Sequence, residues 1–281
     1  MKIVETKSEL RREIKKYKKD SKTIGFVPTM GFLHEGHLKL IEEAKKENHI
    51  VVLSIFVNPL QFGPTEDFDS YPRDRERDEQ LALEAGVDLI FTPHVNEMYP
   101  VIPSYTVNVS DRVDVLCGKS REGHFNGVAT VLTKLFNLIN PDKAYFGMKD
   151  AQQVAVIEGL ISEFHFPLKI VPVATIREED GLAKSSRNVY LNDVEREEAP
   201  MLYKSLLSAA NAIKDGEKDV NSIKEKVSQI LTNETTGKID YVEVLSYPEL
   251  KEISVISGKI IIALAVKFTN ARLIDNITLE V

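Results

Sequence analysis

The sequence predicts an α/β protein in which a parallel β-sheet flanked by helices is followed by a smaller α+β part. Short apolar runs indicate strands at residues 23–27, 49–57, 87–91, 143–146 and 168–173, and the run at residues 49–57 is typical of a strand buried on both faces of a sheet. Apolar residues at helical spacing lie between these runs, at residues 74–85, 128–139 and 151–163. This alternation is typical of a parallel sheet with right-handed crossovers.

The last third of the chain has a different pattern. Two amphipathic helices are expected at residues 193–213 and 220–231, and three strands of an antiparallel sheet at residues 239–244, 259–268 and 271–279. We therefore expect a Rossmann-like domain over residues 1–176 and a smaller α+β domain over residues 177–281. Residues 105–109 alternate in polarity, which predicts an edge strand.

Composition narrows the class of protein. The 281 residues are 43% hydrophobic and 28% charged, as in ordinary globular proteins. The net charge of -7 disfavours a nucleic-acid partner, because a phosphate backbone would be repelled. The single cysteine, Cys117, excludes an internal disulfide, fits a reducing cytoplasm and is expected to be a buried, inert thiol. We find no run with the length of a signal peptide or a membrane span, so a cytoplasmic protein with no membrane partner is expected.

A candidate phosphate site follows the first long strand. Gly31 and Gly36 permit a tight turn, and His34 and His37 stand beside the start of a helix, whose N–H groups attract anions. Zinc proteases space the histidines of their helical motif four residues apart, and here the spacing is three, which disfavours a zinc site. Two merely exposed histidines remain the alternative.

Polar residues also follow two other strands. Asn58 and Gln61 come after the strand at residues 49–57, at the edge where open α/β sheets bind ligands, although Gln61 alone could be an ordinary loop amide. Lys149 and Asp150 precede a helix, where the ammonium can reach a phosphate and the carboxylate can cap the helix or bind a metal.

A third polar segment lies near the predicted domain boundary. Ser185, Ser186 and Arg187 form a loop that could fold over a triphosphate, since a guanidinium binds phosphate oxygens in a fork. An ordinary polar loop is the alternative.

Together these segments resemble the pantothenate synthetases, or pantoate–β-alanine ligases, of the HxGH nucleotidyltransferase superfamily. The resemblance rests on five separated motifs, at residues 28–37, 56–62, 123–130, 146–153 and 185–188. It implies ATP-dependent condensation of (R)-pantoate with β-alanine through a pantoyl-adenylate, with release of pyrophosphate and AMP. It further implies ATP and Mg²⁺ as small-molecule requirements, a role in pantothenate and coenzyme A biosynthesis, and a homodimer.

The same resemblance implies roles for individual residues. The catalytic candidates are His34, His37, Lys149 and Arg187, with His37 as a proton donor or as a hydrogen-bond donor. The candidates for binding ATP are Pro28, Thr29, Met30, Gly31, Phe32, Leu33, His34, Glu35, Gly36, His37, Gly147, Met148, Lys149, Asp150, Ile176, Lys184, Ser185, Ser186 and Arg187. Substrate-binding candidates are Gln61 and Gln153, then Asn58, Tyr71, Arg121 and His124, and metal candidates are Asp78 and Asp150.

Two other functions remain open at this point. A nucleotidyltransferase would leave AMP on its product, and a nucleotide-binding regulatory module would keep the glycines and histidines without needing Gln61 or Gln153. No residue is singled out as the base that deprotonates β-alanine.

Overall fold

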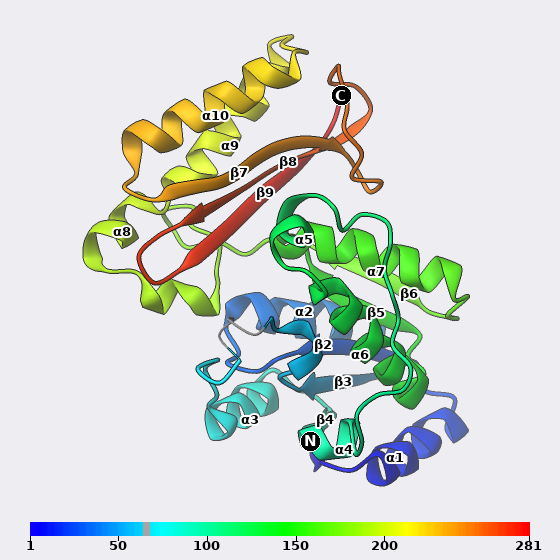
Figure 1. Ribbon diagram of the computed structural model, residues 1–281. Helices are drawn as coiled ribbons and strands as arrows, with labels where there is room; N and C mark the ends of the chain where they lie inside the picture. The colour runs from blue at the N-terminus through cyan, green and yellow to red at the C-terminus, as the bar shows by residue number, and fades with distance from the viewer. Residues whose placement is uncertain (64–67) are drawn as a thin grey trace. The chain divides into compact units, whose positions relative to one another are not determined.

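The computed structural model describes residues 1–63 and 68–281, which form two compact units (Figure 1). The first unit comprises residues 1–111, 120–148 and 156–174, and the second comprises residues 112–119, 149–155 and 175–281. The second unit thus takes two short segments from within the first part of the chain.

A parallel sheet forms the centre of the first unit. Its strands are β1 Lys2–Val4, β2 Ile24–Thr29, β3 Ile50–Ile55, β4 Leu89–Phe91, β5 Lys143–Gly147 and β6 Lys169–Val173. Their order is β1-β4-β3-β2-β5-β6, and all neighbours pair in parallel. The chain moves outward from β2 to β3 and β4 and then returns to the other side of β2 with β5. The carboxyl ends of the neighbouring strands β2 and β5 therefore mark a topological switch point, where ligands bind in open α/β sheets.

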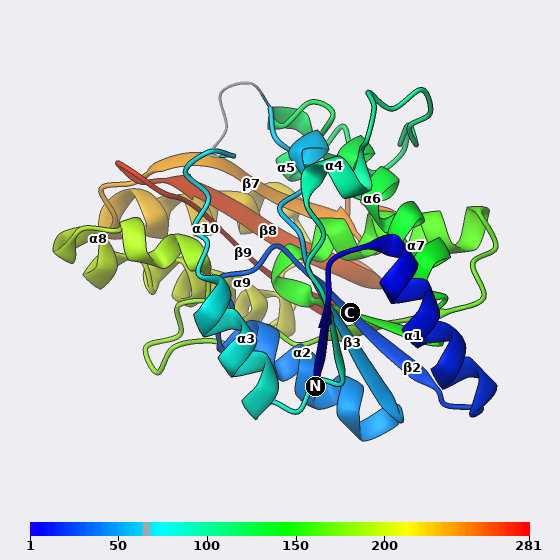
Figure 2. The same ribbon diagram turned by 90° about the horizontal axis from the view of Figure 1, so that it is seen from below.

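Helices cover both faces of this sheet. The helices of this part of the chain are α1 Lys7–Lys19, α2 Glu35–Glu47, α3 Arg75–Glu84, α4 Val95–Met98, α5 Leu116–Ser120, α6 His124–Ile139 and α7 Ala151–Glu163, with the 3₁₀ turns η1 Pro59–Gln61 and η2 Met148–Asp150. Figure 2 shows α2 and α3 on one side of the sheet and α1 and α6 on the other. Val27 belongs to a buried cluster with Ile41 of α2 and Ala82 of α3, whereas the neighbouring Phe26 meets Phe136 of α6 with ring centroids 6.3 Å apart. Alternate residues of β2 are thus buried on opposite faces of the sheet.

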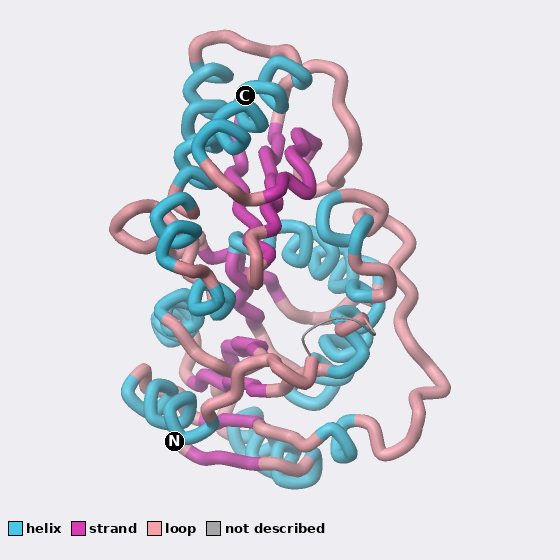
Figure 3. The backbone as a smooth tube through the Cα atoms, turned by 60° about the vertical axis from the view of Figure 1, so that its left-hand side comes forward, coloured by secondary structure: helices cyan, strands magenta, loops and turns pink. Residues whose placement is uncertain are grey.

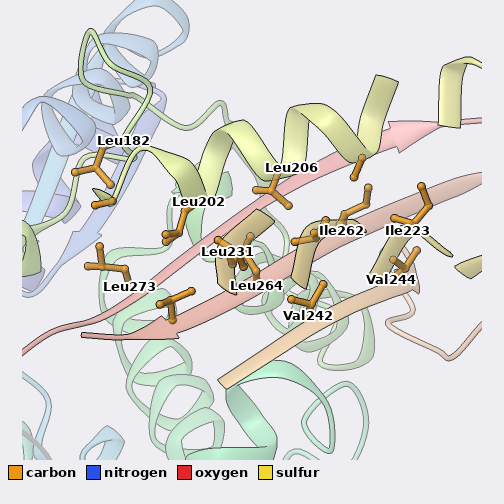
Figure 4. Packing of buried hydrophobic residues seen from close by; sticks show 14 of the residues in the cluster. Leu182, Leu202, Leu206, Ile223, Leu231, Val242, Val244, Ile262, Leu264 and Leu273 are labelled. Carbon is orange, nitrogen blue, oxygen red and sulfur yellow. The ribbon is translucent and has the colours of Figure 1, made fainter. Parts of the chain in front are cut away.

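The second unit contains an antiparallel sheet of strands β7 Lys238–Ser246, β8 Lys259–Lys267 and β9 Arg272–Glu280, in that order. Its helices include α8 Asp193–Glu198, α9 Met201–Lys214 and α10 Val220–Glu234, preceded by the 3₁₀ turn η3 Ser186–Tyr190. Leu206 of α9 and Leu231 of α10 pack with Ile262 and Leu264 of β8 in one apolar cluster (Figure 4). Figure 3 shows the strands of both sheets among their helices. The predicted fold class, a parallel α/β sheet with a smaller C-terminal α+β part, is confirmed.

Several local predictions were wrong. The helix expected at residues 193–213 is broken into α8 and α9 at Pro200, which lacks the N–H that a continuous helix requires. No strand forms at residues 105–109, because Val107 N and Val109 N donate to Thr130 Oγ1 (2.9 Å) and Asn126 Oδ1 (2.8 Å) of α6.

None of the helices in the described ranges has the length and hydropathy needed to cross a bilayer.

Cys117, expected to be buried, is half-exposed. Its Sγ lies 3.3 Å from Arg272 Nη1 and 3.4 Å from the Tyr241 hydroxyl.

Candidate active site

The first turn of α2 fixes the two histidines of the HxGH segment. His34 is the N-cap, and its Nδ1 accepts a hydrogen bond from Gly36 N at 3.1 Å. His37 Nδ1 accepts a longer bond from His34 N at 3.4 Å, and the ring centroids lie 4.1 Å apart. A Cβ on Gly36 would stand 2.8 Å from His34 Cε1, so this ring position requires glycine.

These contacts assign the tautomer of both rings. A neutral imidazole carries one N–H, and an Nδ1 that accepts a hydrogen bond leaves that proton on Nε2. His34 and His37 therefore each present an Nε2–H donor beside the N-terminus of α2, where the helix dipole favours negative charge. Two neutral donors at this position suit phosphate oxygens.

Asp78 of α3 holds the loop that leads to these histidines. Its side chain is buried, and its two carboxylate oxygens accept hydrogen bonds from Phe32 N and Leu33 N, each at 2.7 Å. Gly31 (φ 88°) and Phe32 (φ 50°) both have left-handed backbone conformations, and a Cβ on Gly31 would lie 2.9 Å from Asp78 Oδ2. Burial raises the pKa of Asp78, and the two backbone N–H groups oppose that rise. These contacts favour a loop-holding role for Asp78 over the metal role predicted from the sequence.

The turn η1, after β3, brings two substrate candidates together. Asn58 caps η1, and its Nδ2 donates to Gln61 Oε1 (3.2 Å) and to the Gly127 carbonyl (3.0 Å). Gln61 Nε2 in turn lies 3.0 Å from Met30 Sδ. Thr29 pairs with Ile55 across β2 and β3, so the loops after these strands start side by side. The histidine loop and the η1 turn therefore form one continuous site.

Helix α6 also contacts this turn. His124 Nδ1 lies 2.7 Å from the Gln61 carbonyl, which can only accept, so this nitrogen carries the proton and Nε2 accepts from Arg121 Nη1 at 3.0 Å. A Cβ on Gly127 would stand 2.2 Å from the Leu60 carbonyl oxygen, so only glycine permits this close approach.

Tyr71 is also buried in this region. Its ring packs edge-on against Phe62, the residue after Gln61, with centroids 5.9 Å apart. The first unit therefore brings together all the predicted residues of the segment 28–37 with Asn58, Gln61, Tyr71, Arg121 and His124.

Of the candidates near α7, Gly147 and Met148 belong to the first unit, and Lys149, Asp150 and Gln153 belong to the second. Lys149 Nζ lies 3.9 Å from Asp150 Oδ1, and the Lys149 carbonyl accepts from Asn276 Nδ2 at 2.9 Å. Of the two adjacent glutamines, Gln152 is buried and donates to the carbonyls of Arg112 and Val115, both at 2.8 Å. Gln153 is half-exposed on α7, so it is the member of the pair available to a substrate.

The Ser-Ser-Arg-Asn loop follows a short hairpin in the same unit. Lys184 N donates to the Ile176 carbonyl at 2.9 Å, and Lys184 Nζ lies 2.7 Å from Glu178 Oε2. Ser185 caps η3, since its Oγ accepts from Arg187 N at 3.2 Å. The turn orders the backbone of Ser186 and Arg187. The ion pair of Lys184 with Glu178 favours a role for that lysine in stabilising the hairpin.

The implied magnesium ion can be compared with these residues. Within residues 1–63 and 68–281 no group of three or more His, Cys, Asp or Glu side chains could hold a metal. Asp150, with a half-exposed side chain, can supply one oxygen, whereas both oxygens of Asp78 accept backbone N–H groups. This fits an ion that keeps its waters and binds mainly to substrate phosphates.

Two supporting residues were not predicted from the sequence. Tyr99, after α4, donates its hydroxyl proton to Asn58 Oδ1 at 2.9 Å, and Gln152 holds the segment 112–118. Each acts through a contact between distant parts of the chain.

Fold and candidate site together define an α/β protein of the class that has two histidines at a helix N-terminus and an amide-lined turn at the carboxyl edge of a parallel sheet. The family model of pantoate-beta-alanine ligase matches residues 2–278. The chain therefore belongs to the pantoate-beta-alanine ligase family and is a ligase, as predicted.

Individual relatives agree with this membership. The chain is 60% identical over 280 residues to the pantothenate synthetase of Geobacillus sp. (strain WCH70), covering 99% of each chain. It is 58% identical over 274 residues to that of Bacillus subtilis (strain 168), covering 98% of this chain and 96% of the relative.

Two solved structures are also similar. Pantothenate synthetase from Thermus thermophilus has a TM-score of 0.93 and 45% identity, with 99% of each chain covered. A pantoate-beta-alanine ligase from Francisella tularensis, complexed with beta-gamma ATP and beta-alanine, has a TM-score of 0.80 and 32% identity, covering 99% of this chain and 97% of that one.

Proposed function

We propose that this protein uses ATP to condense (R)-pantoate with β-alanine, through a pantoyl-adenylate. The observation that carries the proposal is the contact of Gln61 Nε2 with Met30 Sδ, 3.0 Å away. This contact joins the η1 turn to the loop that leads to His34 and His37. The amide groups of the turn suit an acid that carries hydroxyls, and the two histidines offer hydrogen-bond donors to phosphate oxygens. The family membership, and the ATP and β-alanine bound by the Francisella tularensis relative, support the same substrates.

In the first half-reaction the pantoate carboxylate attacks the α-phosphorus of ATP and pyrophosphate leaves. A carboxylic acid is already ionised at neutral pH, so this step needs no general base. The obstacle is repulsion between an anion and a polyanion, which hydrogen-bond donors and cations must offset. We assign that role to the Nε2–H groups of His34 and His37, to Lys149 and Arg187, and to the N-terminus of α2.

The tautomer of His37 supports one of its two predicted roles, hydrogen-bond donation. Transfer of the Nε2 proton from a neutral ring would leave an imidazolate, which is very unfavourable near neutral pH. A protonated ring would have a hydrogen on Nδ1 and would lose the bond from His34 N. We therefore assign hydrogen-bond donation to His37, without full proton transfer.

The other ATP contacts are assigned by likeness to the family. Pro28 to His37, Gly147 to Asp150, Ile176 and the segment 184–187 would bind the nucleotide, and a magnesium ion held by the triphosphate and Asp150 would offset part of the phosphate charge. Gln61 and Gln153 would bind pantoate, with Asn58, Tyr71, Arg121 and His124 supporting them. A domain boundary after residue 176, a covering role for residues 177–281, a homodimer and a cytoplasmic location belong to the same proposal.

In the second half-reaction the amine of β-alanine attacks the acyl carbon and AMP leaves. The amine must attack in its neutral form, although an alkylammonium has a pKa of roughly 10. No side chain of the described residues is assigned as its base. Exclusion of water protects the acyl-adenylate until the amine arrives.

Product analysis tests the proposal. Pyrophosphate should be released with ATP and pantoate alone, and AMP should appear in the medium only after β-alanine is added. A nucleotidyltransferase would keep AMP on its product whichever amine is present, so AMP that stays bound to the acid would overturn the proposal. Failure of pantoate to release any pyrophosphate would overturn it equally.

A further inference from the structure

The side-chain amide of Asn58 uses all of its hydrogen-bonding capacity. Its Oδ1 accepts from the Tyr99 hydroxyl at 2.9 Å and from Leu60 N at 3.3 Å. Its Nδ2 donates to Gln61 Oε1 and to the Gly127 carbonyl. An amide offers two acceptor and two donor positions, so all four are engaged, and only 1% of Asn58 is exposed.

This arrangement permits one orientation of the amide. A flipped Asn58 would turn Oδ1 toward the Gly127 carbonyl, which can only accept, and Nδ2 toward Leu60 N, which can only donate. The Gly127 carbonyl and Leu60 N thus determine which amide atom is the oxygen, whereas the Tyr99 hydroxyl, at 2.9 Å against 3.3 Å for Leu60 N, makes the shorter bond to Oδ1 and holds the amide in place. Burial raises the pKa of Tyr99, so its hydroxyl keeps the proton that it donates.

The orientation of Asn58 then sets that of Gln61. Because Gln61 Oε1 accepts from Asn58, the Gln61 amide must present its Nε2 hydrogens on the other side, where Met30 Sδ is the contact. A thioether sulfur is a weak acceptor, and a carboxylate or hydroxyl oxygen of a substrate would bind these hydrogens better.

We propose that Tyr99 is a positioning residue for the acid substrate: it orients Gln61 through Asn58, so that the amide N–H groups of Gln61 face the acid. This inference rests on the proposed function, in which Gln61 binds pantoate. The Tyr99 ring itself is packed against Phe56, with centroids 6.2 Å apart, and lies 4.8 Å beneath Lys134 Nζ. Removal of the hydroxyl alone should therefore leave the ring in place.

The variant Tyr99→Phe tests the inference through steady-state kinetics. Loss of one buried neutral hydrogen bond should raise the KM for pantoate about fivefold, because Gln61 is held less firmly. The kcat and the KM for ATP should not change. A merely structural role for the hydroxyl would lower the melting temperature without this selective effect on pantoate.

A matched control is Tyr145→Phe. Tyr145 is also buried, and its hydroxyl bonds to Asn48 and Glu47 at the C-terminal end of α2, away from His34. This variant should lose stability to a similar degree and keep the wild-type KM for pantoate.

A double variant separates action through Gln61 from direct action. In a Gln61→Ala background, Tyr99→Phe should cause no further rise in the KM for pantoate, because the group that it orients is gone. Independent, additive effects of the two substitutions would overturn the inference, and so would an unchanged KM in Tyr99→Phe alone. If the wild type released no pyrophosphate with pantoate, the proposed function would fail first and this inference with it.

Discussion

Substitution of Asp78 by asparagine should separate a loop-holding role from a metal-binding role. The carboxylate accepts hydrogen bonds from Phe32 N and Leu33 N, each at 2.7 Å, and is buried. Asparagine keeps the shape and one oxygen, but its NH₂ group would face a backbone N–H. One charge-assisted bond is lost and one buried donor loses its partner, which should cost about 2–4 kcal/mol of the free energy of unfolding.

The effect on catalysis follows from the place of this loop in the chain. Residues 31–33 lead directly into His34, the cap of α2, so a displaced loop moves both histidines. A misplacement of about 1 Å in a catalytic group can reduce the rate about 10²-fold. We expect a fall of that order in kcat in Asp78→Asn, while the protein remains folded, since a typical domain is stable by about 5–15 kcal/mol.

The assay is the initial rate of pyrophosphate release, measured with Mg²⁺ varied at saturating ATP and pantoate. A loop-holding role predicts a reduced rate at every Mg²⁺ concentration. If excess Mg²⁺ restored the wild-type rate, Asp78 would be a metal ligand and the reasoning would be refuted. Asp88→Asn is the matched control, because Asp88 also accepts a backbone bond, from Val51 N at 2.8 Å, but at the start of β3. It should lose stability and keep the wild-type kcat.

Three further outcomes are expected. His37→Ala should lower kcat far more than it raises the KM for pantoate, as judged by initial rates, because we propose that its Nε2–H donates to the reacting phosphate. Unchanged turnover would remove His37 from the site. Gln153→Ala should raise the KM for pantoate with little change in melting temperature. Gln152→Ala should mainly lower the melting temperature, since Gln152 donates to two backbone carbonyls. The reverse pattern would contradict the assignment of pantoate binding to Gln153. Glu13→Gln should reduce stability at neutral pH by about 1 kcal/mol, because hydrogen bonds from Lys2 and Lys16 lower the pKa of Glu13 from 4.5 to about 2, while the exposure of both lysines to solvent screens these ion pairs. A carboxyl whose pKa is lowered in the folded state stabilises the fold at pH values above its unfolded pKa. Chemical denaturation should therefore give a larger free energy of unfolding for the wild type than for the variant at neutral pH, and this difference should disappear as the pH falls from 4.5 to about 2.

Much of the fold could be predicted because the central strands are buried on both faces. The run at residues 49–57 is almost continuously apolar, so it lacks the polar face of an amphipathic helix and is not mistaken for one. Strand β3 forms within it. Helix α7 forms at residues 151–163, as expected. The errors have local causes. Pro200 breaks a helix whose apolar spacing continues through it, and residues 105–109 give their backbone bonds to side chains of α6.

The candidate site was predictable only in part. His34, His37 and Gln61 stand at strand ends, where sequence position alone suggests a ligand-binding role. The contacts of Asp78 and Tyr99 depend on residues 45 and 41 positions away in the chain, and no spacing rule signals them. A buried carboxylate near the histidines can be a metal ligand or a backbone acceptor, and only the hydrogen bonds of the folded chain distinguish the two.

The contact between Gly127 and the Leu60 carbonyl limits how this enzyme could be adapted to other acids. Helix α6 and the η1 turn touch backbone to backbone, so no larger side chain can be introduced at residue 127 to reshape the side that we propose binds the acid. Selection for a ligase with a smaller or larger acid substrate should therefore yield changes at Gln61 or Tyr71 and leave Gly127 untouched.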